Sequence, residues 1–167
     1  MYPTSTTPAP HARRRTLLTA LALAPLATLV PLAVRAEAGP ANVIDLWKTR
    51  TCGCCGDWVK HVEQNGFTVR VHEVDDTAPI RRRMGIAQEL GSCHTGLVGG
   101  YALEGHVPAS SIQRLLAEKP DAVGLVVPGM PVGSPGMDGP VYQGQVQPYD
   151  VLLVRKWGQP VVFDSFS

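Results

Sequence analysis

The chain has 167 residues, of which 44% are hydrophobic and 17% are charged, which predicts one globular domain with its own core. The formal charge is +1, but four arginines and one glutamate lie in the N-terminal segment 1–38, which leaves 11 basic and 13 acidic residues beyond it. This balance excludes a basic surface for nucleic acid or for an anionic membrane.

The N-terminal segment 1–38 has the pattern of an export signal. Arginines at residues 13–15 precede an apolar run over residues 17–34, and residues 36–38 form an A-x-A cleavage site. The paired arginines resemble the twin-arginine type of signal. An uncleaved membrane anchor is the alternative, because the run is about long enough to span a bilayer, but two prolines interrupt it. We expect residues 1–38 to be removed in the periplasm, leaving a mature domain over residues 39–167 that meets the membrane only if the signal stays.

Three cysteines lie at the junction between a predicted strand over residues 42–47 and a predicted helix over residues 57–64. Cys52 and Cys55 have the spacing used for thiol-disulfide exchange and for binding thiophilic metals. We expect the side chain of Cys54 to point away from this pair. The unpaired N–H groups and the positive dipole end of a helix N-terminus favour a thiolate here.

The next segment alternates strand and helix. Residues 67–74 have the period-two alternation of a strand, and Thr77 is placed to cap a short helix that ends before Gly85. Arginines at residues 81–83 lie on the outer side of this helix. They suit either a docking patch for an acidic partner or a solvated helix face, and we expect the solvated face.

Two short strands over residues 96–105 then form a hairpin, and a third helix follows. Ser110 or Ser111 is the expected N-cap of this helix. The order strand, helix, strand, helix, hairpin, helix predicts an α/β fold with a thioredoxin-like mixed sheet flanked by helices. In that arrangement the loop before the third strand lies against the N-terminus of the first helix. Cys93 and His94 are therefore expected beside the first three cysteines.

The last third of the chain departs from a plain thioredoxin-like pattern. Residues 128–140 form a loop rich in glycine and proline that carries Met130 and Met137. Strands at residues 149–156 and 160–166 form a predicted C-terminal hairpin, which we expect to extend the sheet.

Four motifs in this order carry a resemblance to a known family. They are Thr51-Cys-Gly-Cys-Cys-Gly56, Ser92-Cys-His-Thr95, Glu104-Gly-His-Val-Pro-Ala109 and Gly129-Met-Pro-Val-Gly-Ser-Pro-Gly-Met137. Together they resemble the bacterial family catalogued as domain of unknown function number four hundred and eleven, along essentially the whole mature chain. The resemblance implies a small exported metal-binding protein with a thioredoxin-like fold and a link to copper handling.

The candidate ligands point to the same chemistry without the family. Soft thiolate and thioether ligands select Cu(I), and zinc is the next candidate because three cysteines and a histidine can close a tetrahedral site. The candidate metal ligands are Cys52, Cys55 and Cys93, with Cys54, His94, Met130 and Met137 nearby. His106 is expected to order the turn before the third helix, and His61 and His72 to be surface residues.

The sequence therefore predicts a periplasmic copper(I)-binding protein that acts as a chaperone or sequestering agent in copper homeostasis or resistance, rather than an enzyme. Its partners would be the copper ion and another periplasmic copper protein or cuproenzyme. Three alternatives stay open: a thiol-disulfide oxidoreductase that uses Cys52 and Cys55, a structural disulfide between these two residues, and a zinc-binding protein. Met130 and Met137 could instead serve only to pack the loop.

Overall fold

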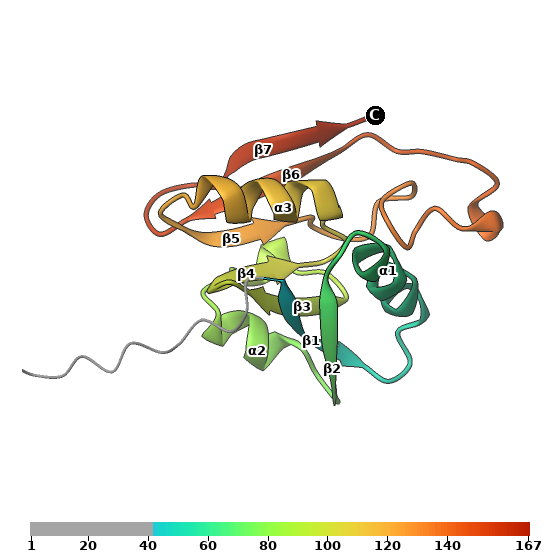
Figure 1. Cartoon of the computed structure of the whole chain (residues 1–167), viewed down its shortest axis with the longest axis horizontal. Coiled ribbons are helices and arrows are strands. Elements are labelled where there is room, and N and C mark those ends of the chain that lie inside the picture. Colours follow the sequence, from blue (N-terminus) through green and yellow to red (C-terminus); the bar gives the residue numbers. More distant parts are fainter. Residues whose placement is uncertain (1–41) are drawn as a thin grey trace, which may run out of the picture. The chain divides into compact units, whose positions relative to one another are not determined.

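A computed structural model describes residues 42–167, so the predicted export signal lies outside the described residues. The described chain forms seven strands, three α-helices and two short 3-10 helices (Figure 1). In chain order they are β1 (Val43–Thr49), α1 (Gly53–Gln64), β2 (Thr68–Val74), α2 (Ala78–Arg83), η1 (Gln88–Leu90), β3 (His94–Val98), β4 (Tyr101–Glu104), α3 (Ala109–Glu118), β5 (Ala122–Val126), η2 (Pro140–Tyr142), β6 (Tyr149–Arg155) and β7 (Val161–Phe166).

The seven strands form one mixed sheet in the order β2-β1-β3-β4-β5-β6-β7. β1 pairs in parallel with β2 and antiparallel with β3, and Lys48 near the end of β1 lies opposite His94 at the start of β3. The C-terminal hairpin of β6 and β7 joins the sheet through β5. The predicted α/β class, with a mixed sheet and a C-terminal hairpin extension, is confirmed.

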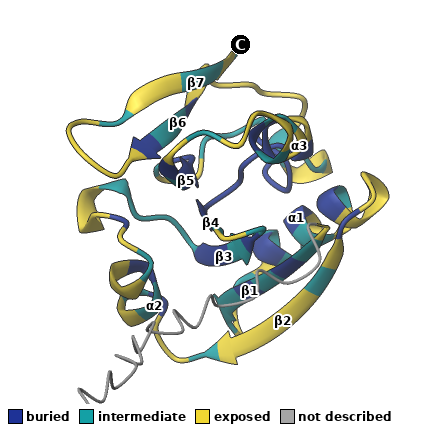
Figure 2. Ribbon diagram, turned by 60° about the vertical axis from the view of Figure 1, so that its left-hand side comes forward, coloured by how far each residue is buried: buried dark blue, intermediate teal, exposed yellow. Residues whose placement is uncertain are grey.

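Successive residues of the central strands pack on opposite faces of the sheet, as the period of two requires. Leu103 and Leu125 join the main core with Trp58 of α1 and Ile112 of α3. Their neighbours on the same strands, such as Ala102, belong to a second cluster with side chains that follow α2. Helices α1 and α3 therefore cover one face, and α2 lies on the other. Figure 2 shows the burial of the central strands and the exposure of the two edge strands.

Two helix starts differ from the sequence expectation, and the first is α1, which begins at Gly53 rather than at residue 57. α3 begins at Ala109 with Pro108 as its N-cap residue, so the predicted serine caps are wrong. Ser111 instead is fully buried and donates a hydrogen bond from Oγ to Asp164 Oδ2 at 2.6 Å, which ties α3 to β7. Among residues 42–167, no helix combines the length and the apolar character that crossing a bilayer requires.

Candidate metal centre

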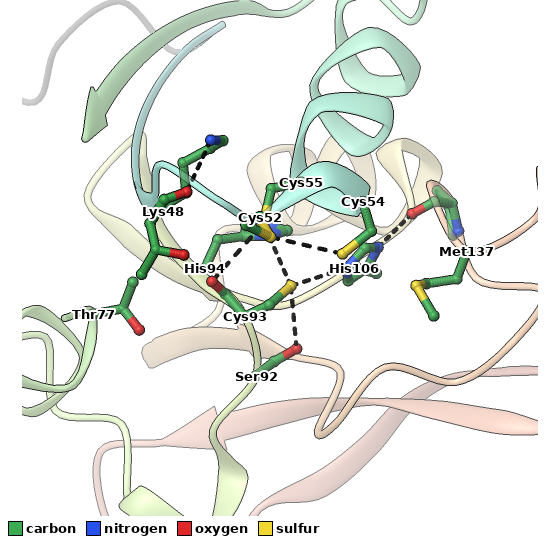
Figure 3. The surroundings of a disulfide bond; sticks show 12 residues. Lys48, Cys52, Cys54, Cys55, Thr77, Ser92, Cys93, His94, His106 and Met137 are labelled. Atoms are coloured by element: carbon green, nitrogen blue, oxygen red, sulfur yellow. Dashed lines mark hydrogen bonds between the residues drawn. A yellow bond between two sulfur atoms is a disulfide. The ribbon is translucent and has the colours of Figure 1, made fainter. Parts of the chain in front are cut away.

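The N-terminus of α1 places three cysteines at the end of β1. Cys52 is the N-cap residue, and its N–H donates to Thr49 O at 3.2 Å. Cys54 and Cys55 lie in the first helical turn, and Cys55 is fully buried. A disulfide links Cys52 to Cys55 with a Cα–Cα distance of 5.5 Å (Figure 3). The spacing of two residues between these cysteines therefore supports a bond across the first turn.

The pairing of β1 with β3 brings Cys93 to this turn from a distant part of the chain. All four cysteine sulfurs lie within 4.8 Å of one another. The sulfur of Cys54 is 3.7 Å from that of Cys52, and the sulfur of Cys55 is 3.8 Å from the carbonyl oxygen of Cys93. The sequence expectation that Cys54 points away from the pair is wrong, because its side chain faces the same cluster. The predicted convergence of Cys93 with the first three cysteines is what the structure shows.

His106 contacts the site directly, although the sequence suggested only a role in the turn before α3. Its Nε2 lies 3.0 Å from Cys93 Sγ, and its Nδ1 lies 2.7 Å from the carbonyl oxygen of Pro135. A carbonyl oxygen only accepts hydrogen bonds, so Nδ1 carries the proton. Burial lowers the pKa of His106, which keeps the ring neutral. The lone pair of Nε2 then faces the Cys93 sulfur.

His94 lies on the other side of the same sulfur and is fully buried. Its Nδ1 is 3.4 Å from Cys93 Sγ, and its ring centroid is 4.5 Å from that of Trp58. Burial is the main reason that the pKa of His94 falls to about 3. His94 Nε2 is buried and has no hydrogen-bond partner within residues 42–167. Two neutral imidazoles therefore flank Cys93, and neutral imidazole is the form that binds metals.

Cys93 is held as a thiol in the absence of an ion. Burial is the largest reason that its pKa rises to about 12, and the nearby sulfur of Cys54 raises it further. Since His106 Nε2 is an acceptor, the thiol S–H of Cys93 donates to it. A metal ion that binds Cys93 must therefore displace this proton.

The loop over residues 128–140, which carries Met130 and Met137, lies beside the first helix. A Cβ added at Gly136 would lie 2.8 Å from Cys54 O and 2.7 Å from Trp58 N, and the φ of Gly136 is +84°. Only glycine allows so close an approach in this conformation. Met137 is buried, and its sulfur accepts a hydrogen bond from Tyr142 Oη at 3.2 Å. Met130, in contrast, is 50% exposed.

The two remaining histidines of the described chain differ from each other. His72 is exposed on β2, as predicted, and contacts Asp45 Oδ1 through Nε2 at 2.9 Å. His61 is half-buried, and its Nε2 accepts a hydrogen bond from the N–H of Ala109 at 3.1 Å. The expectation that His61 is only a surface residue is therefore wrong, because it caps the start of α3.

The donor set suits a soft ion. Four sulfurs gather at one point, and a second group of Cys93, His94 and His106 shares one of these sulfurs. Thiolates and imidazoles in this arrangement bind Cu(I) or Zn²⁺, and sulfur in excess of nitrogen favours Cu(I). A disulfide sulfur is not a thiolate, so Cys52 and Cys55 become ligands of this kind only after reduction.

Comparisons with known proteins agree with this chemistry. The family model described as "Protein of unknown function, DUF411" matches residues 90–137, which include three of the four motifs that carried the resemblance. Two solved structures entitled "Copper resistance protein copG", Form 1 and Form 2, are 42% and 43% identical to this chain, each with a TM-score of 0.70. The matches cover 76% and 75% of this chain and 98% of each of those chains. None of the curated proteins compared matches the chain.

Proposed function

Because the chain belongs to the DUF411 family and is similar to two solved copper resistance proteins, we propose that it is a periplasmic copper(I)-binding protein that serves in copper resistance. The observation that carries the proposal is the gathering of four cysteine sulfurs within 4.8 Å of one another, flanked by two neutral histidines. No other arrangement of side chains in residues 42–167 offers so many soft donors to one ion.

The site fits a protein that takes up and releases its ion. The disulfide between Cys52 and Cys55 and the thiol proton of Cys93 both compete with metal binding. Reduction therefore increases the capacity for Cu(I), and oxidation decreases it. A chaperone or a sequestering agent needs such a reversible site, and its protein partner would be a second exported copper protein.

Competition titration of Cu(I) with a chromogenic chelator tests the proposal. Mature protein is reduced with a phosphine, which supplies the two electrons that open the disulfide, and is then titrated without oxygen. We expect the reduced protein to bind Cu(I) tightly and the disulfide form to bind at least about tenfold more weakly, equivalent to about 1.4 kcal/mol. Reduced protein that does not compete with the chelator would refute the proposal.

A second candidate function is thiol-disulfide exchange, which the Cys52–Cys55 disulfide at the start of α1 favours. Mass spectrometry under non-denaturing conditions separates the two functions, using protein exported from copper-supplemented cells. Retained copper with reduced thiols supports copper binding. A mass deficit of two hydrogen atoms without metal supports the oxidoreductase. The same spectra distinguish copper from zinc, the runner-up metal, by mass.

A further inference from the structure

A buried ion pair lies behind the loop that carries Cys93. Arg81 Nε donates to Glu104 Oε1 at 2.8 Å, and the side chains of these residues are 5% and 0% exposed. Three consecutive arginines on a short helix suggested a solvated face, and Arg82 and Arg83 are indeed exposed. Arg81 instead points into the protein, where Thr77 Oγ1 also accepts from its Nη2 at 3.2 Å.

The two charged side chains also bind the backbone of the residue before Cys93. The N–H of Ser92 donates to Glu104 Oε1 at 2.7 Å, and Arg81 Nη2 donates to Ser92 O at 2.8 Å. The second carboxylate oxygen of Glu104 accepts from Thr95 Oγ1 at 2.6 Å. The ion pair therefore holds both backbone groups of one residue and the side chain of another, with Cys93 and His94 between them.

A buried ion pair of this kind contributes more to the positions of neighbouring groups than to the stability of the fold. Removing two charges from water costs several kcal/mol per ion, so well-packed apolar residues of similar volume often stabilise a fold equally well. What apolar side chains lack is the directional bonds to Ser92 and Thr95. Arginine is suited to this task because its planar fork donates to several acceptors at fixed angles.

We propose that Arg81 and Glu104 are positioning residues that fix Cys93 against the cysteines of α1 and against His106. They touch neither the sulfurs nor the site itself and act through Ser92 and Thr95. The first test, which measures Cu(I) affinity, rests on the proposed function. The second test uses metal-free protein and is independent of it.

Arg81→Lys is the informative variant, because lysine keeps the charge beside Glu104 and loses the fork that reaches Ser92 O. We expect its Cu(I) affinity to fall at least about fivefold, within the usual range for coupled neighbours. The same substitution in a Cys93→Ser background should produce no further loss, since the positioned sulfur is already absent. Equal losses in both backgrounds would mean a general structural role and would overturn the proposal. Arg82→Lys, on the exposed face, is the matched control and should change nothing.

The second readout is the alkylation rate of Cys93 in reduced, metal-free protein, resolved by mass spectrometry of peptides. A loosened loop exposes the thiol more often, so we expect Arg81→Lys to raise the Cys93 rate at least about fivefold and to leave the Cys54 rate unchanged. Unchanged Cys93 reactivity would refute the proposal even if wild-type protein binds no copper. If Arg81→Lys does not fold, Thr95→Val removes only the hydroxyl bond to Glu104, and the same two outcomes decide.

Discussion

The buried imidazole of His94 makes the stability of the metal-free protein depend on pH. Its pKa is about 3 in the folded protein and about 6.5 in the unfolded chain, so the unfolded chain binds more protons between these values. Stability is therefore complete above about pH 6.5 and decreases as the pH falls toward 3. Between pH 7.5 and 4.5 the loss attributable to His94 is on the order of 2 kcal/mol, because each pH unit below the unfolded pKa is worth about 1.36 kcal/mol.

Urea unfolding of the disulfide form, followed by far-ultraviolet circular dichroism between pH 7.5 and 4.5, measures this dependence. His61 and His106 add to the same trend, since burial lowers both of their pKa values. His94→Leu isolates the contribution of one ring, because leucine keeps the position apolar and binds no proton. We expect the variant to lose about one proton from the pH dependence of unfolding.

Parallel pH profiles of wild type and His94→Leu would contradict this pH dependence. That result would mean that His94 is protonated in the folded state or is as accessible to protons as in the unfolded chain. Either outcome would contradict its complete burial between the rings of Trp58 and His106, whose centroids lie 4.5 and 5.2 Å away. It would also remove the argument that His94 stays available to a metal ion in mildly acidic surroundings.

Three further predictions concern the sulfurs and the loop that covers them. Cys54→Ser should weaken Cu(I) binding at least about tenfold in chelator competition, because its sulfur faces the other three; unchanged affinity would place it outside the ligand set. The double variant Met130→Leu with Met137→Leu should lose about tenfold in Cu(I) affinity and nothing in Zn²⁺ affinity. Met84→Leu, which packs against the second core cluster, is the control and should change neither affinity. Equal losses for both metals would mean that the methionines only order the loop. Gly136→Ala should lower the unfolding free energy by about 2 kcal/mol or more in urea titrations, since its Cβ would meet the backbone of the first helix at 2.7 Å; wild-type stability would contradict that packing.

The sequence alone predicted the place of a residue wherever local pattern and chain order determine it. The period of two in residues 67–74 predicted the strand observed as β2, and the strand-to-helix junction predicted that the cysteines lie at the N-terminal end of the first helix. Chain order alone then placed Cys93 beside this junction, because antiparallel pairing sets the start of β3 next to the end of β1. A prediction of this kind needs only the element types and the topology.

The sequence alone did not predict the position of a side chain that depends on a partner far away in the chain. Arg81 and Arg82 belong to one run of three arginines on α2. Only the carboxylate of Glu104, which comes from β4, makes the burial of Arg81 favourable. The imidazole of His106 reaches Cys93 because Gly105 adopts a φ of +71° where a Cβ would lie 2.6 Å from Ser92 Oγ. The glycine of the Gly105–His106 pair, directly after a short predicted strand, was the sequence feature that could have indicated this turn.

Charge balance in the buried site favours a monovalent ion over a divalent ion. Without metal, Cys93 is a neutral thiol between two neutral imidazoles, and burying a net charge there would be costly. A Cu(I) ion that replaces one thiol proton leaves the charge of the site unchanged, whereas Zn²⁺ needs the loss of two protons to do so. Uptake of Cu(I) should then release about one proton per ion and uptake of Zn²⁺ about two, which calorimetry in buffers of different ionisation enthalpy measures. Equal release for the two ions would contradict this charge balance, and no release for either ion would show that the cysteines are already ionised before metal enters.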